Sequence, residues 1–182
     1  MKIADVIRKV DEWQPNVFTL DEKLRWCYEV TADILADCPV YRSLTVDILY
    51  DGAAISLPDG VTFSHVARVY RNGKLQEIRD ERTLEDASPK KGDVVNVVYR
   101  DVPAEYALDK DGNVPENLET VCPAPFDAMY LDYVSAQVAF QQNDLDDYNK
   151  FISRYNNRFL GYKKYFGSNS PVSDRKGFVN LY

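Results

Sequence analysis

The part of the sequence that most constrains the fold is residues 125–166, which predicts two helices in antiparallel contact. Its second half carries apolar and aromatic residues at alternating steps of three and four, which places them on one face of a helix. These residues are Leu145, Tyr148, Ile152, Tyr155, Phe159, Tyr162 and Phe166. The first half has its own apolar face, made of Tyr130, Leu131, Val134 and Val138. The polar break between the halves, residues 141–144, is so short that the two helices must fold back on each other.

Two more helices are predicted near the start of the chain. Residues 3–13 carry apolar residues at helical spacing, and Pro15 ends that helix. The next helix begins with Thr19 as N-cap and Glu22 three residues later, which is the pattern of a capping box. It ends at Cys38, because the residue before a proline avoids the helical region.

Between the helical pairs, residues 44–102 predict a small antiparallel sheet. The first β-rich stretch covers residues 45–50, residues 54–57 are a candidate short strand, and residues 94–99 form the clearest strand. Asn72-Gly73 lies between two alternating stretches, residues 66–70 and 75–78, and predicts a type I′ hairpin, because that turn needs positive φ at both central residues.

The expected fold class is therefore α+β, an antiparallel bundle of about four helices with an inserted sheet domain and an extended C-terminal arm. The expected boundaries are 1–43 for the N-terminal helical pair and 44–124 for the β-rich domain and its loop. The C-terminal helical hairpin takes 125–166, and 167–182 is the arm, which has no apolar periodicity.

Composition narrows the class of function. The formal net charge of −7 argues against a general nucleic-acid binder, since duplex affinity comes from Lys and Arg that neutralise phosphates. The three cysteines form no CxxC pair and predict free thiols in a reducing compartment. No apolar run approaches the roughly 18 residues that a membrane span needs, so we expect a soluble, intracellular chain.

The sequence offers no recognisable catalytic or metal site. The single histidine, His65, excludes a pair of histidine ligands, and no spacing to an orienting carboxylate supports a catalytic role. Residues 109–113 resemble part of a calcium loop but have glycine at the fourth position instead of the sixth, which favours a solvated turn. Lys90-Lys91-Gly92 lacks the flanking residues of a phosphate loop. We therefore predict a protein that is not an enzyme and takes no metal or cofactor.

Two features of the C-terminal hairpin are candidate surfaces. Lys150, Arg154 and Arg158 lie four residues apart and form a cationic stripe, which is either a solvated face or a surface for an acidic partner or passing DNA. Four aromatic residues fall away from the apolar stripe and are either covered by other parts of the chain or make subunit contacts. These are Tyr133, Phe140, Phe151 and Tyr165.

Two groups of short motifs, one in each helical pair, occur together in a known family. The first group is Ile3-Ala4-Asp5-Val6-Ile7, Asp11, Pro15-Asn16, Asp21-Glu22-Lys23-Leu24-Arg25-Trp26 and Glu29-Val30. The second is Pro125-Phe126-Asp127, Tyr130-Leu131-Asp132-Tyr133, Ala136-Gln137-Val138, Asn143-Asp144, Asp147-Tyr148-Asn149 and Tyr155-Asn156. Together they resemble the head–tail connector (adaptor) proteins of tailed bacteriophages of anaerobic, gut-type bacteria. The resemblance covers the four helices, whereas the sheet and the tail match only in layout.

The resemblance implies a non-enzymatic virion protein of the neck, made in the cytoplasm of the bacterial host. Connectors form a ring, commonly dodecameric, between the portal protein and the stopper or tail proteins, and they extend the DNA channel without sequence-specific contacts or a membrane. It also implies a portal-binding arm, with Phe178, Val179, Leu181 and Tyr182 as candidates. The alternatives are a tail-completion or stopper protein of the same neck, or a non-virion binding module that uses its β domain.

Overall fold

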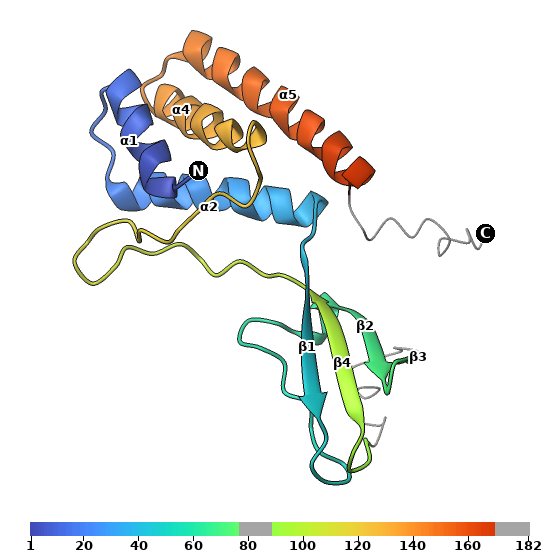
Figure 1. Ribbon diagram of the computed structural model, residues 1–182. Coiled ribbons are helices and arrows are strands. Elements are labelled where there is room, and N and C mark those ends of the chain that lie inside the picture. Colours follow the sequence, from blue (N-terminus) through green and yellow to red (C-terminus); the bar gives the residue numbers. More distant parts are fainter. Residues whose placement is uncertain (77–88, 170–182) are drawn as a thin grey trace. The chain divides into compact units, whose positions relative to one another are not determined.

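The computed structural model describes residues 1–76 and 89–169, which form two compact units (Figure 1). The helical unit combines Met1–Cys38 with the chain from Glu105 onward, and the sheet unit is Pro39–Ala104. The predicted α+β class is confirmed: four α-helices and one four-stranded antiparallel sheet lie within the described residues.

The helical unit is built around α4 (Met129–Gln141), which contacts each of the other three helices. These are α1 (Ile3–Trp13), α2 (Leu20–Asp37) and α5 (Leu145–Asn169). The predicted helical hairpin is confirmed, since α4 and α5 run antiparallel and are joined through Asn143 at a φ of 58° (Figure 1). Because α4 has neighbours on several sides, it buries Asp132, Ser135, Ala136 and Ala139 as well as its predicted apolar face.

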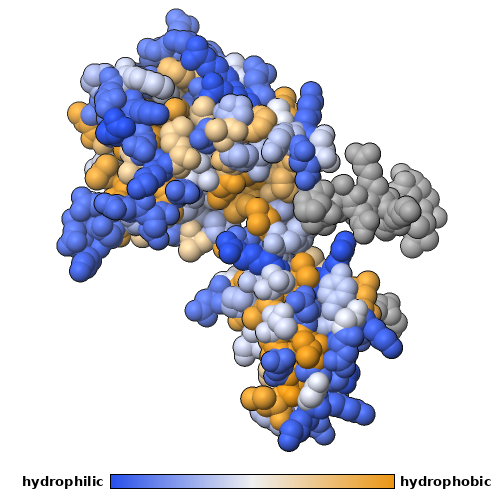
Figure 2. All heavy atoms as spheres, viewed as in Figure 1, coloured by the Kyte–Doolittle hydropathy of each residue, from blue (hydrophilic) through white to orange (hydrophobic). Residues whose placement is uncertain are grey.

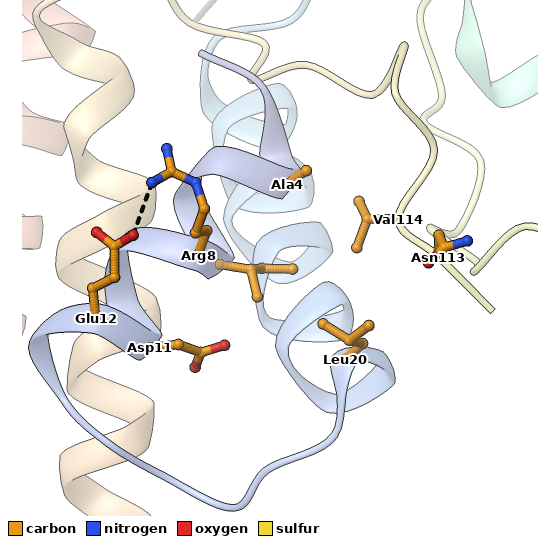
Figure 3. A pocket seen from close by; sticks show the side chains of 8 residues that line it. Ala4, Arg8, Asp11, Glu12, Leu20, Asn113 and Val114 are labelled. Carbon is orange, nitrogen blue, oxygen red and sulfur yellow. Dashed lines mark hydrogen bonds and ion pairs between the residues drawn. The ribbon is translucent and has the colours of Figure 1, made fainter.

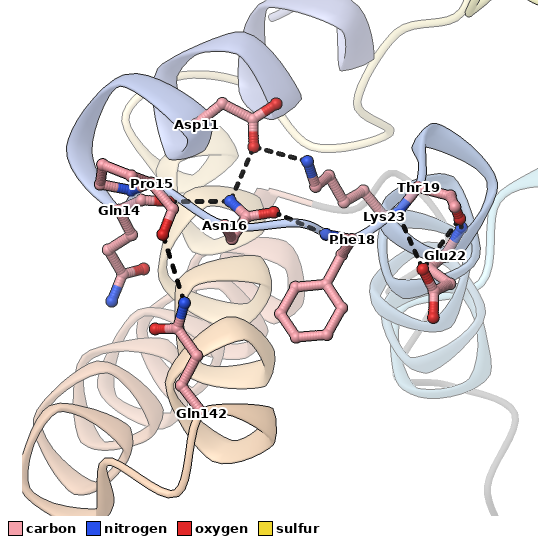
Figure 4. Close-up of polar contacts among 9 residues, drawn as sticks. All are labelled: Asp11, Gln14, Pro15, Asn16, Phe18, Thr19, Glu22, Lys23 and Gln142. Atoms are coloured by element: carbon pink, nitrogen blue, oxygen red, sulfur yellow. Dashed lines mark hydrogen bonds and ion pairs between the residues drawn. The ribbon is translucent and has the colours of Figure 1, made fainter.

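The loop between α1 and α2 is held by side chains of both helices (Figure 4). The predicted capping box is present: Glu22 N donates to Thr19 Oγ1 at 3.2 Å, and Thr19 N donates to Glu22 Oε2 at 2.8 Å. Lys23, which is buried, donates to Asp11 at 2.6 Å. Gln142 Nε2 donates to the carbonyl of Pro15 at 3.3 Å, which ties this loop to the turn between α4 and α5.

Three hydroxyl groups meet inside the helical unit. Thr31 Oγ1 lies 2.6 Å from the hydroxyl of Tyr130 and 2.7 Å from the hydroxyl of Tyr106. Burial raises the pKa of Tyr130 well above its usual value, so this hydroxyl stays protonated and can donate. The cluster joins α2, α4 and the segment that leads back from the sheet unit, because each of them supplies one hydroxyl.

The sheet unit has the strand order β1-β4-β2-β3, with every neighbouring pair antiparallel. The strands are β1 (Tyr41–Asp47), β2 (Val66–Arg71), β3 (Lys74–Gln76) and β4 (Val94–Arg100). The predicted hairpin turn is confirmed, with φ of 50° at Asn72 and 77° at Gly73. One face of the sheet buries a small core of Ile48, Val69, Val95 and Val97.

The structure differs from the sequence-based expectation at four places. Strand β1 begins at Tyr41 and ends at Asp47 instead of covering residues 45–50. Residues 54–57 form no strand, because their apolar side chains pack on the sheet core without joining its hydrogen-bond ladder. Helix α5 continues through Asn169, whose side-chain amide donates to the carbonyl of Tyr165 at 2.9 Å. Leu145, at the start of α5, is exposed although its spacing places it on the apolar stripe.

Some sequence-based expectations lie outside the described residues. These are the end of the stretch predicted after the hairpin, residues 77 and 78, and the portal-binding candidates Phe178, Val179, Leu181 and Tyr182.

Candidate assembly surfaces

The four aromatic residues predicted for subunit contacts fall into two groups. Tyr133 is used inside the helical unit: its hydroxyl donates to Glu29 Oε2 at 2.9 Å and its ring lies 5.0 Å from the ring of Tyr155. Tyr133 therefore offers little surface to another subunit. Its contacts favour the alternative in which other parts of the same chain cover it.

Phe140, Phe151 and Tyr165 keep part of their rings accessible. The ring of Phe140 lies 5.4 Å from the ring of Tyr148, and the ring of Tyr165 lies 5.3 Å from that of Phe126 and 6.3 Å from that of Tyr162. Phe151 and Tyr165 are separated by fourteen residues of α5, so at about 1.5 Å per residue they lie roughly 21 Å apart along the helix. The accessible aromatic residues thus mark two separate places on the hairpin.

The cationic stripe lies on one flank of α5, but its three members have different environments. Lys150 pairs with Asp147 at 3.0 Å and lies over the ring of Phe151, 5.1 Å from its centroid. Arg154 lies over the same ring at 5.8 Å. Within residues 1–76 and 89–169, Arg154 makes no ion pair, whereas Lys150 and Arg158 each pair with a carboxylate. Among the three cations of the stripe, Arg154 is therefore the one whose charge is available to a partner.

Arg158 is anchored to a buried carboxylate. Its Nη1 lies 3.1 Å from Asp132 Oδ2, while the Asp132 side chain is only 8% exposed. This contact is an ion pair without a well-directed hydrogen bond, and the hydroxyl of Ser135 one turn away also has no hydrogen-bond partner within the described residues. Burial raises the pKa of Asp132, and the nearby Arg158 and Arg154 partly oppose that rise.

The Asp132–Arg158 pair gives a testable prediction. Arg158→Ala should lower the free energy of unfolding by about 1–2 kcal/mol at neutral pH, between the values for exposed and fully buried pairs, because it removes the ion-pair partner of Asp132. The cost should shrink in an Asp132→Asn background, which chemical denaturation of the four variants of the cycle measures.

The pH dependence of this pair follows from the raised pKa. The folded state holds the Asp132 proton more tightly than the unfolded state, so stability increases as the pH falls through the folded-state pKa toward the unfolded value of about 3.9. The cost of Arg158→Ala should therefore be largest at neutral pH and fade on acidification. A cost that does not change with pH would show that Asp132 is not the group that Arg158 compensates.

The structure also exposes apolar residues beside the two helix reversals of the helical unit, an apolar end of which the sequence analysis singled out only Phe140. It consists of Trp13, Val17, Phe140 and Leu145, all exposed, with Val17 at 97%. Each of them lies within three residues of Pro15 or Gln142, whose hydrogen bond joins the two helix reversals. The sequence does contain one indication of this surface, because Trp13 lies outside the apolar spacing that buries the other large apolar residues of α1. Figure 2 shows hydrophobic residues at the surface of the helical unit among mainly polar ones.

A groove of about 540 Å³ lies between α1, the start of α2 and the loop at residues 113–114 (Figure 3). Its apolar lining comes from Ala4, Ile7, Leu20 and Val114, and its polar lining from Arg8, Asp11, Glu12 and Asn113. Arg8 donates to Glu12 at 2.8 Å and to Asp5 at 3.1 Å, so its charge is matched by carboxylates.

The remaining polar candidates have structural roles. His65 Nδ1 accepts from Thr62 N at 3.0 Å within a short turn. Asp109 Oδ1 accepts from the backbone of Asp111 and Asn113, at 2.9 and 2.8 Å, which closes its own loop. All three cysteines are buried and free, and burial raises the pKa of Cys122 to about 12. Across the described ranges, no cluster of three or more potential metal-ligating side chains occurs.

Comparison with known proteins adds no assignment: no family model matches the chain, and no curated protein matches it. Among the described residues, no helix has both the length and the apolar character that a membrane crossing requires.

Proposed function

We propose that this chain is a structural protein of a bacteriophage neck, a head–tail connector (adaptor) subunit. It assembles into a ring between the portal protein and the stopper or tail proteins and extends the DNA channel. It acts by assembly and not by catalysis, with the virion neck as its place of action.

One observation carries this proposal: the two motif groups that resemble connectors pack against each other in one helical unit. Residues 3–30 supply α1 and most of α2, and residues 125–156 supply α4 and the first half of α5. Motif residues make the contacts between the two groups, as in the hydrogen bond from Tyr133 to Glu29. The sheet unit is inserted between the groups without separating them.

The accessible surfaces are compatible with a ring. A head-to-tail ring needs two different patches on each subunit, since its interfaces are heterologous. The apolar end with Trp13 and Val17 and the flank of α5 with Phe151 and Arg154 are two such patches within the helical unit. The exposed cations of the flank suit an acidic partner surface or the backbone of passing DNA, which needs no base contacts.

Electron microscopy of the purified chain mixed with the portal protein of the same phage tests the proposal. We expect a ring of added density on the portal. Density that requires prior addition of a stopper or tail protein would favour the tail-completion alternative. Absence of binding to any neck protein would overturn the proposal and favour a binding module.

Charge reversal of the flank sharpens that experiment. Lys150→Glu combined with Arg154→Glu should weaken assembly on the portal if this flank meets an acidic surface. The matched control is Lys110→Glu combined with Lys164→Glu, which changes the net charge equally at two other exposed positions. Equal behaviour of the two double variants would exclude a specific role for the flank.

A further inference from the structure

The sheet unit has a braced tip that exposes two large apolar side chains. Two loops form it, residues 48–53 and residues 89–93. Ile48 N donates to Asp93 O, Gly92 N donates to Ile48 O and Gly52 N donates to Pro89 O, each at 2.9 Å. On this support, Leu49 is 75% and Tyr50 is 65% exposed.

Side-chain hydrogen bonds add to these backbone hydrogen bonds between the two loops. Asp51 Oδ1 accepts from Lys91 N at 2.7 Å, and Asp93 accepts from Lys90 N at 2.7 Å and from the side chains of Asn72 and Arg71 at 2.7 Å each. These hydrogen bonds lower the pKa of Asp93 to about 2, so the brace is charged across the physiological range. A rigid apolar tip loses little conformational entropy when it enters a partner.

The groove of the helical unit offers a site of matching character. Its volume of about 540 Å³ lies within the usual range of roughly 300–1,000 Å³ for binding pockets. Figure 3 shows Ala4, Leu20 and Val114 converging on it from α1, α2 and the facing loop. It can therefore receive the side chains of Leu49 and Tyr50.

The charges around the two surfaces are complementary. The groove is bordered by the carboxylates of Asp5, Asp11 and Glu12. Arg8 pairs with Asp5 and Glu12, and Lys23 pairs with Asp11, so these five side chains sum to a charge of −1. The tip displays the exposed side chains of Lys90 and Lys91, and Arg71 pairs with Asp93. Asp51 and Asp93 remain charged while they accept hydrogen bonds from the backbone, so these five side chains sum to a charge of +1. Opposite charges at the rim of an apolar contact favour encounter and orientation.

We propose that the tip of one copy of this chain docks in the groove of a second copy. The contact is heterologous, because each copy contributes a different surface, so it propagates from copy to copy as a ring requires. The inference deepens the proposed function by naming a subunit contact and rests on that proposal for its biological role. The contact itself needs no other protein.

Sedimentation velocity of the purified chain at increasing concentration tests the contact. We expect the weight-average mass of the wild type to rise with concentration. A tip variant, Leu49→Ser with Tyr50→Ser, and a groove variant, Glu12→Lys with Leu20→Ser, should each weaken association at least tenfold. Leu75→Ser is the matched control, since Leu75 is an exposed leucine on β3 of the same sheet unit, and it should behave as wild type.

Mixing the two variants provides the decisive measurement. The tip variant keeps an intact groove and the groove variant keeps an intact tip, so together they should form a dimer that cannot grow. A second readout reverses the charges: Glu12→Lys alone should weaken association, and adding Lys90→Glu and Lys91→Glu should restore it. Restoration also shows that the variants remain folded.

Three results would overturn the inference. One is a wild-type chain that stays monomeric at concentrations up to about 1 mM, since a dissociation constant above that value would be too weak for a specific contact. Another is a mixture of the two variants that forms no dimer. The last is a cross-link between Tyr50→Cys and Val114→Cys that forms only within one chain, which would assign the groove to the chain's own tip.

The portal experiment separates the two proposals. A ring on the portal that survives the tip substitutions would overturn this contact alone. Association of the purified chain without any binding to neck proteins would overturn the proposed function alone.

Discussion

Replacing Tyr130 with alanine should lower the free energy of unfolding of the helical unit by about 3–5 kcal/mol, the range for a buried aromatic residue. Tyr130 is fully buried on α4, so its loss leaves a cavity at the point where α2 and α4 meet. It also removes a hydrogen-bond partner of Thr31 and of Val121 N, which donates to the Tyr130 hydroxyl at 3.4 Å.

The matched variant Tyr130→Phe separates packing from hydrogen bonding. It keeps the ring and removes the hydroxyl, and Thr31 retains Tyr106 at 2.7 Å and the carbonyl of Cys27 at 3.3 Å. The cost should therefore be only about 1 kcal/mol. Denaturant unfolding followed by the helical circular dichroism signal measures both variants. An alanine variant no less stable than the phenylalanine variant would contradict the tight packing at this position.

The sequence patterns correctly predicted the elements that are determined by residues close together in the chain. The apolar spacing of α1, the capping box of Thr19 and Glu22, and the positive φ at Asn72 and Gly73 each depend on residues close in the chain. The extent of burial on α4 could not be predicted in this way. Three helices surround it, so Asp132 is buried although its side chain is charged, and only the tertiary packing determines that.

The candidate surfaces also combine features that local spacing predicts with features that depend on tertiary packing. Spacing alone placed Lys150, Arg154 and Arg158 on one flank of a helix, but the sequence has 29 acidic residues and no signal for which of them pairs with Arg158. Leu145 has the spacing of a buried residue, yet it lies in the first turn of α5, where the end of α4 no longer covers it.

The groove and the tip were both missed, because each combines residues from segments that are distant in the sequence. Val114 meets Leu20 across the groove, and residues 48–53 meet residues 89–93 at the tip. No periodicity links such segments, so only the folded chain brings these side chains together.

Deleting residues 170–182 should abolish attachment to the portal and leave the helical unit folded. The truncation keeps the whole of α5, whose last side-chain hydrogen bond is made by Asn169. The deleted residues include the candidate arm Phe178, Val179, Leu181 and Tyr182, which the connector resemblance assigns to the portal. Thermal unfolding measures the first expectation, and co-sedimentation with the portal protein measures the second.

Two controls distinguish the arm's sequence from its mere length. Replacing residues 170–182 with a Gly/Ser segment of equal length should fail to bind, because the apolar side chains are gone. Substituting only Phe178, Val179, Leu181 and Tyr182 by serine should fail in the same way, since burial of apolar surface drives such a contact at about 25 cal/mol per Å². Portal binding by the truncated chain at the wild-type level would remove the arm from the proposed mechanism. The helical unit would then have to hold the portal through its own exposed surfaces, with Trp13 and Val17 as the first residues to substitute.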